Sequence, residues 1–258
     1  MRRPANLKRA QNSPLRKVGL ARALSKLGYC SRSQAAELIR AGRVKVNGAI
    51  RRDAESPVHL ARDKIEIDHS PIAKAHKIYL MLNKPRGVVT TASDEKGRET
   101  VYEFLPKDCG WIAPVGRLDK ASEGLLLVTN DSEWAARIID PTTHLDKIYH
   151  VQIGIVADET LLQRVMNGID GDRLKAKSAV LLRHGERNSW LEIALDEGKN
   201  RQIRRIFEGL EIEVLRLLRV AIGPLPLGNL AKGQSRPLTA QEKCLLEAAM
   251  KNVRVREN

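Results

Sequence analysis

The apolar residues after Lys77 occur in short runs separated by turn residues, and this pattern restricts the fold more than any other feature of the chain. The runs are IYLMLNKP, GLLLVTN, KIYHVQIGIV, KSAVLLRH, SWLEIAL and EVLRLLRVAIG. Helical patterns intervene at SEWAARII, DETLLQRVMNGI and RQIRRIFEGL. Short, closely spaced runs favour strands that pair with their neighbours in sequence. We therefore predict an α+β domain with a mixed, mostly antiparallel sheet flanked by helices.

The positive charge of the chain is concentrated before this domain. The 258 residues hold 45 Lys and Arg against 31 Asp and Glu, a net charge of +14. Residues 1–17 hold six basic side chains and no acid, and residues 18–76 hold 11 basic against 6 acidic side chains. Residues 77–258 are nearly neutral. Such a basic surplus favours a polyanionic partner, either nucleic acid or an anionic membrane surface, and nucleic acid is the leading candidate.

Composition also narrows the cellular setting. No apolar run approaches the ~20 residues that a membrane span needs, and no apolar stretch of the kind found in a secretory signal follows the basic N-terminus. The three cysteines are widely spaced and odd in number, which fits neither a disulfide framework nor a zinc site. We expect a cytoplasmic monomer that does not bind membranes.

Residues 18–68 have the pattern of two short helices followed by a hairpin. Leucines recur at helical spacing up to Gly28, a residue that suits a left-handed helix end. Ser31 with Gln34 predicts a capping-box start for a second helix, and Asn47 with Gly48 predicts a two-residue hairpin turn. The cations expected to contact RNA phosphates in this unit are Arg32, Arg40, Arg43 and Lys45.

The rest of the chain divides by composition around these two patterns. Residues 1–17 have no periodicity, so we predict a disordered basic arm there. Residues 69–76 are expected to be a linker, residues 77–242 the α+β domain, and residues 243–258 a C-terminal helix and tail.

One carboxylate stands out in the stretch GRLDKASEGLLLVTND, residues 116–131. The chain has no phosphate-binding glycine loop, no GxSxG elbow and no cysteine–histidine set with metal spacing. Asp119 has only Glu123 and Asp131 near it in sequence. If Asp119 reacts, it therefore works alone and without a metal, as a nucleophile or as a base at carbon. Either role needs a cation that keeps it ionised.

Candidate cations lie in EGKNRQIRRIFEGL, residues 197–210, where a glycine loop leads into a predicted helix. Cations at a helix N-terminus oppose the helix dipole, so helix stability does not explain them. An anionic ligand or a buried carboxylate does. The residues concerned are Lys199, Arg201, Arg204 and Arg205.

Four segments of the α+β domain resemble pseudouridine synthases of the RsuA/RluB/RluE/RluF type. They are LNKPRGVVTT (82–91), GRLDKASEGLLLVTND (116–131), KIYHVQI (147–153), and EGKNRQIRRIFEGL with RLLRVAIGPL (197–225). SRSQAAELIRAGRVKVNG and DKIEID in the preceding unit resemble the S-four-like RNA-binding domain. The similarity covers about residues 18–242. One departure is Ser122-Glu123, where the family commonly has a threonine-serine pair.

The resemblance implies roles at matching positions. Asp119 would be the catalytic aspartate, Arg204 the basic residue paired with it, and Tyr149 the aromatic that packs on the target uracil. Arg117 would stabilise RNA around a flipped nucleotide. Lys84 would help to shape the pocket floor. The expected substrate- and RNA-binding residues of the domain are Arg117, Lys84, Lys199, Arg201 and Arg205.

The implied reaction is the isomerisation of a uridine in ribosomal RNA, of either subunit, to pseudouridine. No group leaves and no redox change occurs, so neither a cofactor nor a metal is expected. Attack of the aspartate on the anomeric carbon and removal of the 2′ proton to give a glycal both stay open. The alternatives are a non-catalytic RNA-binding or ribosome-assembly factor and a metal-dependent nuclease. The intact Asp119, Tyr149 and Arg204 argue against the first, and the lack of an acidic cluster argues against the second.

Overall fold

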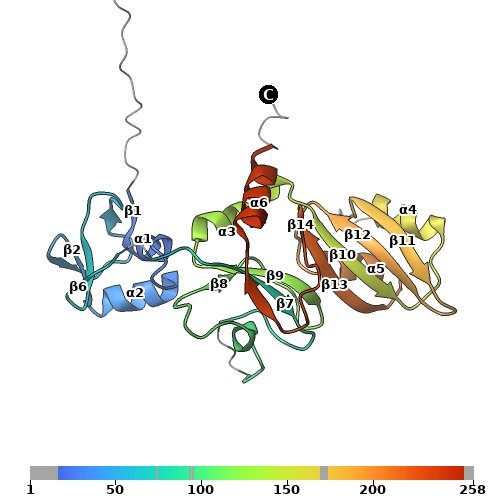
Figure 1. Cartoon of the computed structure of the whole chain (residues 1–258), viewed down its shortest axis with the longest axis horizontal. Coiled ribbons are helices and arrows are strands. Elements are labelled where there is room, and N and C mark those ends of the chain that lie inside the picture. Colours follow the sequence, from blue (N-terminus) through green and yellow to red (C-terminus); the bar gives the residue numbers. More distant parts are fainter. Residues whose placement is uncertain (1–16, 74, 93, 95, 169–173, 253–258) are drawn as a thin grey trace, which may run out of the picture. The chain divides into compact units, whose positions relative to one another are not determined.

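The computed structural model describes residues 17–73, 75–92, 94, 96–168 and 174–252. The chain divides into two compact units, with the boundary between Ala75 and His76 (Figure 1). Residues 1–16 of the predicted basic arm and residues 253–258 of the predicted tail lie outside the described residues.

The first unit contains two helices and short strands around one apolar cluster. The helices are α1 (Leu20–Lys26) and α2 (Arg32–Arg40). The strands of a four-stranded sheet, in spatial order, are β3 (Ala49–Arg51), β2 (Val44–Val46), β5 (Ile65–Ile67) and β6 (Ser70–Pro71). A further pair joins β1 (Val18–Gly19) to β4 (Pro57–Val58).

Local signals explain these elements, and the predicted turns are confirmed. The Ser31 side chain accepts from the Gln34 backbone N–H, and the Gln34 side chain accepts from the Ser31 backbone N–H, forming the expected capping box. Asn47 and Gly48 both have positive φ angles, of 52° and 84°, between the antiparallel strands β2 and β3. Two positive φ angles in a row are what a type I′ hairpin turn requires.

The second unit is built on a nine-stranded mixed sheet with one parallel contact, between β9 and β13. Along the main path, the strands are β11 (Ser178–His184), β12 (Ser189–Leu195), β10 (Lys147–Ile153), β13 (Val214–Ile222), β9 (Glu123–Thr129), β7 (Tyr79–Lys84) and β15 (Ser235–Pro237). Two short strands pair beside this path: β14 (Leu225–Pro226) and β8 (Ala113–Pro114). The predicted mixed, mostly antiparallel sheet is confirmed.

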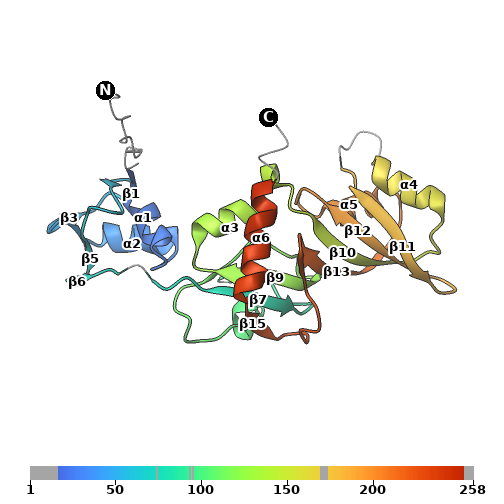
Figure 2. The same ribbon diagram turned by 45° about the horizontal axis from the view of Figure 1, so that its top comes forward.

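Helices cover both faces of this sheet (Figure 2). They are α3 (Ser132–Ile139), α4 (Glu159–Asn167), α5 (Gln202–Glu208) and α6 (Ala240–Asn252), with 3₁₀ turns η1 (Val101–Phe104) and η2 (Pro141–Thr143). Among the described residues, no helix is long and apolar enough to cross a membrane.

Strand β9 is buried along its whole length because apolar layers pack on both of its faces. Leu125 and Leu127 belong to the cluster that contains residues of α3 and α6. Leu126 and Val128 point the opposite way, into a cluster with residues of η1 and with Leu118. Alternate residues of a strand face opposite sides of its sheet. The strand that follows Asp119 therefore serves as a rigid support held from both sides.

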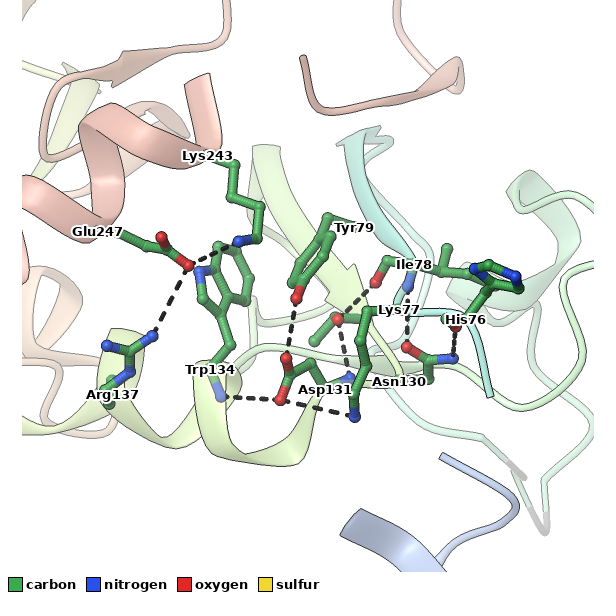
Figure 3. Close-up of polar contacts among 11 residues, drawn as sticks. His76, Lys77, Ile78, Tyr79, Asn130, Asp131, Trp134, Arg137, Lys243 and Glu247 are labelled. Atoms are coloured by element: carbon green, nitrogen blue, oxygen red, sulfur yellow. Dashed lines mark hydrogen bonds and ion pairs between the residues drawn. The ribbon is translucent and has the colours of Figure 1, made fainter. Parts of the chain in front are cut away.

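The residues at the end of β9 fasten α3 and α6 to β7 (Figure 3). The Asp131 side chain accepts from the Trp134 backbone N–H and from the Tyr79 hydroxyl, which caps α3 and ties it to β7. The Tyr79 and Trp134 rings meet edge to face, and the Lys243 ammonium of α6 lies 4.8 Å from the centre of the Tyr79 ring. Asn130 accepts from the Ile78 backbone N–H at 2.9 Å. Asn130 and Asp131 are therefore structural residues.

Candidate active site

A cavity of about 550 Å³ opens in the second unit. Its walls come from segments far apart in sequence: the turn that carries Asp119, strand β10, the loop before α5, and strand β13. Of the residues predicted to act on RNA, the cavity brings together Asp119, Tyr149, Arg117, Lys199 and Arg201. A second cavity, of about 460 Å³, shares Arg117 and Asp119 with the first.

The turn that carries Asp119 is held by its backbone. The Ser122 N–H donates to the Asp119 carbonyl, and the Gly87 N–H donates to the Lys120 carbonyl at 2.7 Å. The Thr90 hydroxyl donates to the carbonyl of Leu118 at 2.7 Å. No hydrogen bond to the half-buried Asp119 carboxylate is formed within the described part of the chain. The turn is therefore fixed while its carboxylate stays available for a ligand.

Lys84 holds this turn from beneath, and the structure corrects its expected role in binding RNA. The side chain is 0% exposed. Its ammonium donates to the carbonyls of Pro85, Asp119 and Ser122 at 2.9, 3.2 and 2.9 Å. Three carbonyls use all three ammonium N–H donors, so none is left for RNA. Burial lowers the pKa of Lys84 to about 8, against the opposing effect of the Asp119 and Glu123 charges.

Activity is expected to fall as the pH rises above about 8, because neutral Lys84 has only two N–H donors for three carbonyls. This loss is not due to unfolding. The pKa of Lys84 in the folded chain lies below the ordinary Lys value. Between these two pKa values the unfolded chain therefore binds more protons than the folded chain. Lys84 thus makes folding more favourable as the pH rises through this range. A pH–rate profile with parallel thermal melting checks the prediction. A fall in rate that follows a fall in melting temperature would contradict it.

Arg204 lies near Asp119 but does not form the expected direct pair. Its Nη2 donates to the carbonyl of Ala121 at 3.1 Å, and no Arg204–Asp119 ion pair occurs among the described residues. Because Ala121 belongs to the same turn as Asp119, its carbonyl competes with the Asp119 carboxylate for the Arg204 guanidinium. Burial lowers the pKa of Arg204, and the Asp119 charge opposes this effect. The buried Nε of Arg204 has no partner within the described chain.

Tyr149 occupies the middle of β10, opposite Ile193 of β12 and Arg219 of β13. Its half-buried ring borders the cavity and packs against apolar clusters of both halves of the sheet. Strand pairing on two sides fixes the backbone of Tyr149. The ring is therefore a rigid wall of the cavity, which suits a platform for a planar base.

Three of the four remaining predicted cations of this unit line the cavity. Lys199 forms a 2.7 Å ion pair with Glu197. Arg201 is exposed and takes a left-handed conformation, with φ of 50°, directly before α5. Arg205 is exposed but does not line either cavity, and Arg117 is exposed at the border of both.

Two cations of the cavity wall escaped the sequence-based prediction. Lys147 and Arg219 are 9% and 6% exposed and line the cavity with Asp119. Arg219 is a basic residue inside an apolar strand pattern, and Lys147 is the first residue of another strand; these positions are the signal that could have revealed them.

Glu123 occupies the position where the chain departs from the resembling family, and it is 1% exposed. Its carboxylate pairs with Arg216 at 2.8 Å and with Lys232 at 2.6 Å. Burial raises the pKa of Glu123, but hydrogen bonds from Lys232 and Arg216 outweigh this, so the net pKa lies below its ordinary value. Glu123 faces neither solvent nor the cavity, and it ties β9 to β13 and to the chain before β15.

The four predicted cations of the first unit have different surroundings. Arg32 and Arg40 are exposed on α2. Arg43 makes a two-pronged ion pair with Asp68. The ammonium of half-buried Lys45 lies 3.2 Å from Nδ1 of His69.

Among the residues that the structure describes, no group of three or more His, Cys, Asp or Glu side chains is placed to hold a metal ion. The carboxylate of Asp119 instead lies among cations and an aromatic ring.

The chain is similar to known proteins along most of its length. A family model described as RNA pseudouridylate synthase matches residues 78–209, and an S4 domain model matches residues 18–65. Ribosomal large subunit pseudouridine synthase B of Bacillus subtilis is 36% identical, over 89% of this chain and 95% of the relative. An uncharacterized RNA pseudouridine synthase of Aquifex aeolicus is also 36% identical, over 90% and 95%.

A solved structure agrees with this assignment. A crystal structure of a pseudouridylate synthase has a TM-score of 0.62 and 32% identity, and the match covers 89% of this chain and 99% of that one. The protein therefore belongs to the RNA pseudouridylate synthase family of isomerases and carries an S4 domain ahead of its synthase domain.

Proposed function

We propose that the protein is a ribosomal RNA pseudouridine synthase that isomerises a specific uridine, with Asp119 as the reacting carboxylate and without a cofactor. The observation that carries this proposal is the cavity shared by Asp119 and Tyr149, with the half-buried guanidinium of Arg204 close to Asp119. The B. subtilis relative, named for the large ribosomal subunit, supports ribosomal RNA as the substrate class. We place the reaction in the cytoplasm.

The three site residues take separate roles in this reaction. Asp119 acts on the ribose, either by attack at C1′ or by removal of the 2′ proton. Tyr149 packs on the uracil, and Arg204 balances the charge of Asp119. The target base must leave its stack to reach them, which costs a few kcal/mol. A cavity of about 550 Å³ is within the range that encloses small ligands.

The first unit supplies affinity for the RNA backbone in this proposal. Exposed Arg32 and Arg40 on α2 are available for phosphates, and Arg43 and Lys45 flank them at the start of β2. Contacts of this kind release counterions, so binding weakens as salt concentration rises.

Pseudouridine mapping of total RNA from cells with and without the gene tests the proposal. We expect one ribosomal RNA position to lose its pseudouridine in the deletion strain and to regain it when the unaltered gene is restored. The lost position identifies the substrate and its ribosomal subunit. Loss confined to transfer RNA, or no loss at all, would contradict the proposal.

A further inference from the structure

Two buried cations line the cavity that contains the reacting carboxylate, and no ion-pair partner within the described residues explains them. Arg219 and Lys147 are both more than nine-tenths buried, and both line the cavity that contains Asp119. Buried cations are normally paired, because desolvation penalises their charge. Neither side chain forms an ion pair with any residue that the structure describes.

Arg219 is held in place at one atom and has no hydrogen-bond partner at another within the described residues. It lies where β13 leaves its short parallel contact with β9, beside Gly124. Its Nε donates to the carbonyl of Leu125 at 2.7 Å, which fixes the direction of the guanidinium. Its Nη2 is buried without a hydrogen-bond partner in the described chain. A fixed guanidinium with a desolvated N–H lacks an acceptor from the described part of the chain, so its buried charge is not compensated there.

Lys147 stands at the start of β10, two residues before Tyr149. Its side chain makes no hydrogen bond within the described residues. Burial and the nearby Arg219 charge lower its pKa, with Asp146 and Asp196 opposing. An apolar side chain would fill this position at lower cost, so packing alone does not account for a lysine here.

We propose that Arg219 and Lys147 form a cationic site that stabilises the detached uracil anion during isomerisation, an inference that rests on the proposed function. When the C1′–N1 bond breaks, its electron pair stays on the base. The base becomes a uracil anion with its charge spread over N1, O2 and O4. Bond formation from C5 to C1′ then completes the isomerisation, and the proton lost from C5 balances the one gained at N1.

Both open routes need this site. In one, the Asp119 carboxylate forms a bond to C1′ as N1 leaves, and this bond breaks when C5 attacks C1′. In the other, Asp119 takes the 2′ proton and the C1′=C2′ bond forms as N1 leaves; when C5 bonds to C1′, the double bond opens and C2′ takes that proton back. Either way the base departs with a negative charge. Donors that are fixed before the reaction stabilise such developing charge most effectively. The two cations also keep the anion inside the cavity while it turns.

Lys147→Met and Arg219→Met are tested with the full chain and substrate RNA, by nucleoside chromatography under single-turnover conditions. Each variant is expected to lower the isomerisation rate constant by about 10²-fold, the effect typical of losing one such donor. RNA dissociation constants are expected to stay within about twofold, because the cations act on the transition state. Lys107→Met, a change at an exposed residue outside both cavities, is the matched control and should leave the rate unchanged.

A substrate with a better leaving group distinguishes stabilisation of the uracil anion from a purely structural role of Lys147 and Arg219. The same RNA with 5-fluorouridine at the target carries a more acidic base, whose anion needs less stabilisation. The defect of each variant in consuming the target nucleoside is expected to shrink to below about tenfold. If Arg219→Met does not fold, Lys147→Met still gives the test, because the Lys147 side chain makes no hydrogen bond with the residues that the structure describes.

Equal defects on uridine and 5-fluorouridine, unchanged rates, or a loss confined to RNA affinity would each overturn the anion-stabilising role. Thermal melting of each variant shows whether a lower rate follows from unfolding, and a rate loss that follows melting also overturns it. If the unaltered chain isomerises uridine, these results leave the proposed function intact. If the unaltered chain isomerises no RNA, both proposals fail.

Discussion

Replacing Asp119 with Asn is expected to lower the single-turnover rate of pseudouridine formation by at least about 10⁴-fold. The amide keeps the size and shape of the carboxylate, so the turn held by Lys84 and Thr90 should stay in place. It loses the negative charge that either route requires, because an amide neither attacks C1′ nor takes a proton from C2′. Tritium release from RNA labelled at uridine C5 measures the rate, because C5 loses its hydrogen during the reaction.

The matched control for this substitution is Asp108→Asn, which makes the same chemical change at an exposed position outside both cavities. It is expected to retain the rate of the unaltered chain. RNA binding by Asp119→Asn should remain within about twofold of the unaltered chain, because phosphate contacts supply the affinity. Retention of more than about a tenth of the rate would contradict the catalytic role of Asp119.

Replacing Gly124 with Ala is expected to lower the free energy of unfolding by more than about 4 kcal/mol, an exceptional loss for one methyl group. A Cβ at this position would lie 2.3 Å from the carbonyl oxygen of Arg219 and 2.8 Å from its nitrogen. Both atoms belong to the backbone of β13 and cannot move aside without breaking the contact between β9 and β13. The φ angle of 103° adds strain for any residue with a side chain.

Gly87→Ala separates these two causes, since Gly87 has a similar φ of 95° but nothing within 4 Å of an added Cβ. Its expected cost is only the conformational one, roughly 1–2 kcal/mol. Urea titration of both variants measures the difference. A Gly124→Ala variant no less stable than Gly87→Ala would contradict the close approach of the two strands.

The elements themselves were largely predictable from local sequence. The helix predicted at SEWAARII appears as α3, at the same bounds. The capping box at Ser31 and the hairpin at Asn47 were also predicted correctly, because the capping box joins residues three positions apart and the hairpin pairs residues at most seven positions apart. The residues that make such interactions are close together in the sequence, so local sequence patterns suffice to predict them.

The surroundings of the candidate site were less predictable. The motif pattern pointed to Asp119 and Tyr149, and the structure places both on one cavity. The motif pattern does not indicate that the Lys84 ammonium donates to three carbonyls, or that Nη2 of Arg204 donates to the carbonyl of Ala121. Both outcomes depend on which carbonyls the folded turn presents, and that is decided only when distant segments meet.

Glu123 shows the same division most directly. In sequence it is an extra acid between a serine and a glycine, and a side chain facing solvent, the RNA channel or a cation of its own was equally consistent with it. Its partners, Arg216 and Lys232, come from distant parts of the chain, and they convert it into a buried anchor between strands.

The sequence alone indicated the order of elements, the family motifs and the candidate carboxylate, because each depends on spacing along the chain. Tertiary structure alone decided which charges are paired and which are buried without a partner in the described chain, such as Nη2 of Arg219. The physical reason is that desolvation and ion pairing depend on distances in space, and packing sets those distances only after the strands have come together.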